Sequence, residues 1–134
     1  MATSIVTYSG NLRTTAVHLS SKTEIITDAP VDNKGRGEAF SPTDLAATSL
    51  ASCMLTIMGI AAEAHGFNID GAKAEVTKVM GENPRRIIEI IVNIVFPQNN
   101  YSDKHKEFFR RTADTCPVAK SLHPDLKQTI LLNF

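Results

Sequence analysis

The chain has two cysteines, Cys53 and Cys116, and any redox or nucleophilic chemistry would depend on them. A thiolate is a nucleophile, and a pair of thiols can exchange two electrons by forming and breaking a disulfide. Cys116 directly precedes Pro117 at an expected helix start, where free N–H groups and the helix dipole favour a thiolate and predict a lowered pKa. Cys53 lies within an apolar helical run, where an inert core cysteine is the ordinary alternative.

Other residue types offer weaker sites. The two cysteines cannot form a four-sulfur zinc site, and their spacing with the four histidines matches no zinc finger or knuckle. His65 falls at the expected end of a helix, where capping is the expected role. His18, His105 and His123 share no motif spacing, so a Cys–His pair of the kind a thiol hydrolase needs has no support. The sequence therefore predicts no metal site.

The composition limits the partners. In 134 residues, 14 Lys and Arg balance 14 Asp and Glu, so the formal net charge is zero. This balance gives no basic excess to attract nucleic acid or a membrane surface. The N-terminal residues lack the features of a signal peptide, so we expect a cytoplasmic protein with reduced thiols. The uncharged run Leu45–Ala62 is diluted by Ala, Ser, Thr and Gly, which favours a buried helix at the centre of a domain or dimer over a membrane span.

The hydrophobic pattern predicts a single α+β domain over residues 1–134, with the element order β-β-β-α-β-β-α-α-β. A capping box begins the long helix: Ser41 caps it, Pro42 takes its first position, and Asp44 stands in for the usual Glu or Gln. Gly66 is expected to end it just after His65. We expect strands at residues 4–8, 12–19, 23–27, 68–80, 86–96 and 129–134, a loop at 28–40, and helices at 42–65, 103–113 and from 117.

Two segments resemble the signatures of the OsmC/Ohr family, which comprises osmotically inducible protein C and organic hydroperoxide resistance proteins. Residues 37–54, GEAFSPTDLAATSLASCM, resemble the family's Pro-capped central helix with a cysteine near mid-length. Residues 116–122, CPVAKSL, resemble its Cys-Pro-Val motif, and the loop around residues 27–30 looks closest to a less-characterised OsmC-like branch. The resemblance implies the OsmC-like fold, an intertwined homodimer built on the long helices, and no metal, haem or flavin cofactor.

By this resemblance the chain is a thiol peroxidase with peroxiredoxin-like activity, which reduces organic hydroperoxides in an oxidative stress response. Cys53 is implied to be the peroxidatic thiol, which becomes a sulfenic acid. Cys116 is implied to be the resolving thiol, which condenses with that sulfenic acid to a disulfide. A dithiol reductant, such as a lipoylated protein, would then reduce the disulfide by thiol exchange.

The family's charged helpers match less well. The resemblance implies an Arg that polarises the peroxide and a Glu that orients the Arg, but the family's Glu position on the first helical turn is Thr43 here. Glu38 in the preceding loop and Asp44 are the alternatives for the carboxylate, and Arg13 and Arg36 are those for the Arg. We predict Arg13 and Glu38. The mismatch leaves open a different function, a non-catalytic small-molecule or acyl-chain binding protein on the same dimer scaffold.

Overall fold

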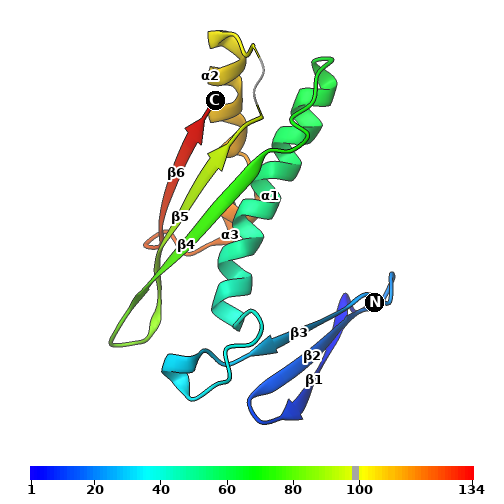
Figure 1. Cartoon of the computed structure of the whole chain (residues 1–134), viewed down its shortest axis with the longest axis vertical. Coiled ribbons are helices and arrows are strands. Elements are labelled where there is room, and N and C mark those ends of the chain that lie inside the picture. Colours follow the sequence, from blue (N-terminus) through cyan, green and yellow to red (C-terminus); the bar gives the residue numbers. More distant parts are fainter. Residues whose placement is uncertain (98–99) are drawn as a thin grey trace. The chain divides into compact units, whose positions relative to one another are not determined.

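The computed structural model describes residues 1–97 and 100–134, and its helices and strands follow the predicted order (Figure 1). The α+β class is therefore confirmed. The chain divides into two compact units, Met1–Ala46 and Ala47–Phe134. A single domain over residues 1–134 stays a prediction beside this division. The elements are β1 (Ser4–Gly10), β2 (Arg13–His18), β3 (Glu24–Asp28), η1 (Val31–Asn33), α1 (Pro42–Ala64), β4 (Lys73–Gly81), β5 (Arg86–Val95), α2 (Asp103–Ala113), α3 (Pro117–Ser121) and β6 (Lys127–Asn133).

The unit Met1–Ala46 is built on an antiparallel sheet in the order β1-β2-β3. It has no apolar core of its own, because its three buried residues, Thr27, Asp28 and Ser41, are all polar. The apolar side chains of the sheet stay exposed, among them those of Ile5, Val6, Tyr8, Ile25 and Ile26. A sheet with this much exposed apolar surface needs a partner surface to become stable.

The sequence predicts a loop at residues 28–40, but Asp28 belongs to β3 and the connection that follows contains the short 3₁₀ helix η1. Backbone hydrogen bonds hold it in shape, from Gly35 N–H to Pro30 O at 2.9 Å and from Gly37 N–H to Ala29 O at 3.2 Å. A side chain at Gly35 would collide with the Ala29 carbonyl, since a Cβ there would lie 1.7 Å from its oxygen. The loop is therefore a defined connection that fixes the backbone of Glu38.

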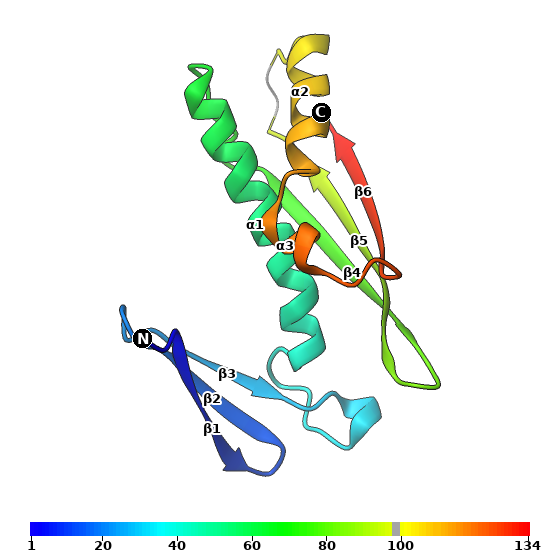
Figure 2. The same ribbon diagram turned by 180° about the vertical axis from the view of Figure 1, so that it is seen from behind.

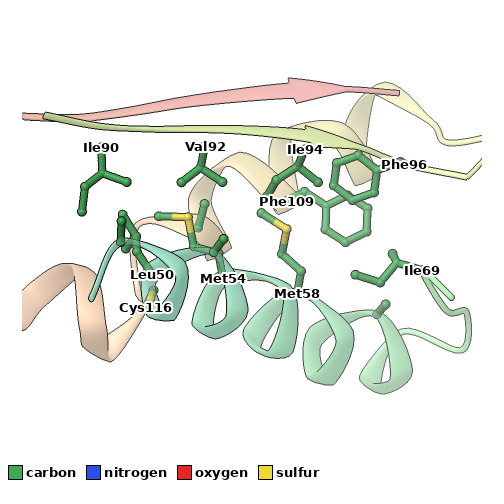
Figure 3. Packing of buried hydrophobic residues seen from close by; sticks show 14 of the residues in the cluster. Leu50, Met54, Met58, Ile69, Ile90, Val92, Ile94, Phe96, Phe109 and Cys116 are labelled. Atoms are coloured by element: carbon green, nitrogen blue, oxygen red, sulfur yellow. The ribbon is translucent and has the colours of Figure 1, made fainter. Parts of the chain in front are cut away.

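In the unit Ala47–Phe134, β4 and β5 form an antiparallel hairpin and β6 lies parallel to β5. The helices α1 and α2 cover one face of this sheet (Figures 1 and 2). Figure 3 shows the core between them, where Phe109 of α2 joins side chains of α1 and β5. Each of these large apolar side chains contributes about 1.5–3 kcal/mol when fully buried. The fully buried members include Leu50, Met54, Met58, Ile90, Val92, Ile94 and Phe109.

The strand β5 departs from a regular alternation at one residue. An unbroken alternation would place Ile88 on the same face as the buried Ile90, yet Ile88 is exposed. The register shifts between Val79 and Met80, which pair with Glu89 and Ile87, so Ile88 has no partner across the hairpin. This bulge lies close to the turn, and it takes Ile88 out of the core.

The capping box that begins α1 is confirmed. The Ser41 hydroxyl accepts a hydrogen bond from the Asp44 N–H at 3.0 Å, and the Asp44 carboxylate accepts one from the Ser41 N–H at 3.0 Å. At the other end, the His65 ring donates to the Ala61 carbonyl at 3.0 Å, the capping role expected of it. Gly66 follows with φ +80°, as expected of a C-terminal glycine.

The apolar helix α1 buries only one face within the chain. Its buried residues recur at helical spacing, whereas Ser49, Ser52, Thr56 and Ile60 on another side are exposed. By length and composition alone, α1 is the one helix within residues 1–97 and 100–134 that could cross a membrane, with a mean hydropathy of 1.8 in its most apolar window. A core helix of a soluble protein meets the same test, and the buried side of α1 packs as such a helix does.

Candidate active site: a pair of thiols and an arginine–carboxylate cluster

The structure brings Cys53 and Cys116 together, although they are far apart in the sequence. Both are free thiols, and they lie close enough for Cys53 to influence the pKa of Cys116. Cys53 lies on α1 and is partly buried against the core, while Cys116 is fully buried at the position that caps α3. Figure 3 shows Cys116 next to Leu50 of α1. The two thiols are therefore neighbours within one unit of the chain.

The local environment of Cys116 corrects the prediction about its pKa. The N–H groups of Val118 and Ala119 at the start of α3 lower it, as expected for a helix start. Burial has a larger effect in the opposite direction, and the neighbouring Cys53 thiol adds to it, so the pKa of the Cys116 thiol is raised from its usual 9.0. Cys116 consequently stays a protonated thiol at neutral pH.

Arg13 and Glu38, the two charged residues predicted for the site, also lie together. One Nη2 hydrogen bond of Arg13 reaches the Glu38 carboxylate at 3.2 Å. The stronger partner of Arg13 is Asp28, which the sequence places in the predicted loop and which was not among the candidate site residues. The Arg13 Nε donates to one Asp28 oxygen at 2.7 Å and its Nη2 donates to the other at 2.8 Å.

The Arg13–Asp28 pair is a bidentate ion pair with unequal exposure. The side chain of Asp28 is 1% exposed and that of Arg13 is 25% exposed, while Glu38 at the rim is 65% exposed. The guanidinium hydrogen bonds hold the pKa of the Asp28 carboxyl below its usual value, and the same contacts raise the pKa of Arg13. Both side chains are therefore charged over the whole physiological range, and Asp28 fixes the orientation of the guanidinium.

Asp44 and Arg36, the alternative residues for the carboxylate and the arginine, make other interactions. Asp44 serves the α1 capping box through its carboxylate. Arg36 lies close enough to Asp28 for its charge to lower the pKa of that carboxyl, but as the smallest of the contributions. Register could have revealed Asp28 from the sequence, because a turn centred between residues 20 and 21 pairs Arg13 with Asp28 across β2 and β3. A cross-strand pair of opposite charges is a recognised stabilising pattern.

A pocket of about 300 Å³ lies in the unit Ala47–Phe134. Met54, Ala119 and Lys120 are among its lining residues, and neither cysteine is. Within residues 1–97 and 100–134, no group of three or more His, Cys, Asp or Glu side chains could hold a metal ion. The thiol pair and the Arg13 cluster belong to different units of the chain.

Comparison with known proteins identifies the family. A family model described as OsmC-like protein matches residues 35–130, so the chain belongs to the OsmC/Ohr family. No curated protein matches the chain. The chain is similar to a crystal structure from Psychrobacter arcticus 273-4, named as a candidate osmotic-stress-induced and detoxification response protein. The two share 60% sequence identity and a TM-score of 0.96, over 99% of this chain and 96% of that one.

More distant structures share the fold. The organic hydroperoxide resistance protein OsmC of Legionella pneumophila has 14% identity and a TM-score of 0.73, over 100% of this chain and 98% of that one. The organic hydroperoxide resistance protein OhrB of Bacillus subtilis has 16% identity and a TM-score of 0.66, over 98% of each chain. These likenesses confirm the predicted OsmC-like fold.

Proposed function

We propose that the chain is a thiol-dependent peroxidase that reduces organic hydroperoxides through Cys53 and Cys116. The observation that carries the proposal is the pair of neighbouring free thiols in a chain of the OsmC/Ohr family. Structural neighbours named organic hydroperoxide resistance proteins support the substrate class. The zero net charge suits an uncharged organic peroxide, which needs no electrostatic steering.

The reaction has two steps on the protein. The Cys53 thiolate attacks the distal oxygen of the hydroperoxide, so a sulfur–oxygen bond forms, the oxygen–oxygen bond breaks, and the leaving alkoxide takes a proton to become an alcohol. The Cys116 sulfur, after losing its proton, then attacks the Cys53 sulfenic acid and forms the disulfide, and the hydroxyl leaves as water. A dithiol reductant such as a lipoylated protein supplies two electrons and two protons to regenerate both thiols.

Arg13 has the chemistry to assist the first step. A guanidinium that donates to the peroxide stabilises the negative charge that develops on the leaving oxygen. Its rigid hold by Asp28 supports this role, because a preorganised donor need not reorganise during the reaction. Glu38 completes the cluster from the loop.

We propose further that the working form is a cytoplasmic homodimer. The exposed apolar residues of β1 and β3, together with the exposed Ile60 of α1, support dimerisation, since isolated monomers rarely leave that much apolar surface in water. The two free cysteines suit a reducing compartment. Sedimentation equilibrium at micromolar concentration tests the assembly, and a stable monomer would contradict it.

The activity is tested by mixing the reduced protein with cumene hydroperoxide and following both thiols by mass spectrometry. We expect a Cys53–Cys116 disulfide within minutes at modest excess and the release of cumyl alcohol. The two single variants serve as matched controls, because the chain has no other cysteine. Cys53→Ser should abolish turnover, and Cys116→Ser should accumulate a Cys53 sulfenic acid that dimedone captures.

The opposite result would be two thiols that stay reduced over minutes. It would contradict the proposed peroxidase function and favour the alternative function, a small-molecule or acyl-chain binding protein. A ligand of that alternative function would bind equally well to the Cys53→Ala variant.

A further inference from the structure

The carboxylate contacts of Arg13 leave one side of its guanidinium open. Nε and Nη2 both donate to Asp28, and Nη2 also donates to Glu38. Within the unit Met1–Ala46, Nη1 makes no hydrogen bond or ion pair. A guanidinium is planar and its donors have fixed directions, so a carboxylate bound along the Nε–Nη2 edge also determines where Nη1 points.

Asp28 is better placed than Glu38 to determine that direction. It offers both carboxylate oxygens to Arg13, it is nearly fully buried, and its Oδ2 also accepts the Glu38 N–H at 3.2 Å. Its backbone is tied on both sides, by pairing with Arg13 across β2 and β3 and by a hydrogen bond from its own N–H to the Phe40 carbonyl at 3.0 Å. Glu38 makes one contact of 3.2 Å with Arg13 from a mostly exposed side chain.

The charges of Arg13, Asp28 and Glu38 also indicate that the direction of the Arg13 donors matters. Arg13 carries one positive charge, and Asp28 and Glu38 together carry two negative charges, so these three residues offer no positive excess to an anion. Arg13 can therefore stabilise a developing oxyanion only through a directed hydrogen bond, and the direction is what a bidentate partner provides.

From these observations we propose that Asp28 is the positioning residue for Arg13, and that it holds Nη1 as the donor presented to the hydroperoxide. This inference rests on the proposed peroxidase function. It means that a carboxylate on β3 performs the orienting role in this chain, whose helix carries Thr43 where the family resemblance implied a Glu. Glu38 is then an outer contact that adds little to the orientation.

The kinetic test compares carboxylate variants in the full-length protein with cumene hydroperoxide. Asp28→Asn keeps the size of the side chain but loses its charge, and misdirection of Arg13 should lower kcat/KM by about 10²-fold, chiefly through kcat. Glu38→Gln should cost less than about fivefold, as expected for an exposed ion pair. Glu24→Gln is the matched control, since Glu24 is an exposed carboxylate of the same strand and pairs with Val17. We expect this variant to keep the activity of the wild type.

A second measurement does not depend on activity. In ¹⁵N-edited NMR spectra, an arginine Nε–H held by a buried carboxylate exchanges slowly with water, and Arg13→Lys assigns that signal by removing it. We expect the slow signal to persist in Glu38→Gln and to be lost in Asp28→Asn. This readout also serves if Asp28→Glu is needed as a better-folded variant, because a longer side chain alters the bidentate geometry while it keeps the charge.

The outcomes separate the two proposals. If the wild type does not oxidise with hydroperoxide, the proposed function fails, and the NMR signal alone tests which carboxylate holds Arg13. If the wild type is active but Asp28→Asn stays within fivefold of it, or if Glu38→Gln loses as much activity as Asp28→Asn, the role of Asp28 is overturned. Persistence of the slow Nε–H signal in Asp28→Asn would overturn it as well.

Discussion

In the unit Ala47–Phe134 the two thiols lie against a packed apolar core, whereas in the unit Met1–Ala46 the arginine cluster lies on a sheet without such a core. The difference affects what each unit can hold in place. Core packing fixes Cys53 and Cys116 through many small contacts. Arg13 depends instead on a few strong directional bonds, chiefly those to Asp28. Apolar packing thus positions the two thiols, whereas charged hydrogen bonds position the Arg13 guanidinium.

The comparison predicts that the two units respond differently to loss of an apolar side chain. Phe109→Ala opens a cavity in the core of the unit Ala47–Phe134 and should lower the free energy of unfolding by about 3–5 kcal/mol. This loss should not depend on protein concentration, because Phe109 is fully buried within the chain. Denaturant titration at several concentrations measures it.

Ile25→Ala is the matched variant in the unit Met1–Ala46, where Ile25 is 45% exposed. Its effect should be smaller and should appear only at concentrations at which the proposed dimer forms, because only a partner would bury that side chain. Equal losses of unfolding free energy for the two variants, independent of protein concentration, would contradict this difference between the two units.

Within the thiol pair, we expect Cys53 to react with iodoacetamide at least about tenfold faster than Cys116 at pH 7, because a reagent reaches a fully buried thiol only through local opening. The raised pKa of Cys116 adds a pH dependence. Its thiolate forms only as the pH rises above the usual 9.0, so its alkylation should accelerate on the alkaline side of that value. Peptide mass spectrometry separates the two sites.

The Cys53→Ala variant sharpens this prediction. It removes the neighbouring thiol that helps to raise the pKa of Cys116, so Cys116 should become reactive at lower pH, while burial continues to slow it. Equal rates for the two cysteines of the wild type at pH 7 would contradict the assignment of Cys116 as the protected thiol.

Features of the site that depend on neighbouring residues could be predicted from the sequence. The Ser41–Asp44 capping box and the helix that starts after Cys116 were both found, because caps and proline preferences act within a few residues. The net pKa shift of Cys116 was predicted with the wrong sign. The helix start has the expected effect, but burial by residues distant in the sequence outweighs it.

Asp28 shows a second limit. Its partner Arg13 lies across a hairpin, whereas the proline, glycines and mixed charges of residues 28–40 predict a loop that includes Asp28. Only the register of β2 and β3 makes it a cross-strand neighbour of Arg13. The bulge that exposes Ile88 is similar, since the pairing of β4 with β5 decides it and the alternation within β5 does not.

The smallest expected effect concerns the caps of two helices. Ser41→Ala and Ser102→Ala each remove a hydroxyl that accepts a hydrogen bond from a backbone N–H, at 3.0 Å in α1 and 3.1 Å in α2. Such a loss costs about 1 kcal/mol of stability.

The two sites differ in exposure: Ser41 is buried and Ser102 is exposed. Water can replace the lost partner at Ser102 but not at Ser41, so Ser41→Ala should cost more, toward the upper limit of about 2 kcal/mol for such caps. Chemical denaturation of both variants measures the difference. Equal costs would mean that the start of α1 opens to water, and that the cap preceding the helix of Cys53 is held no more firmly than a surface cap.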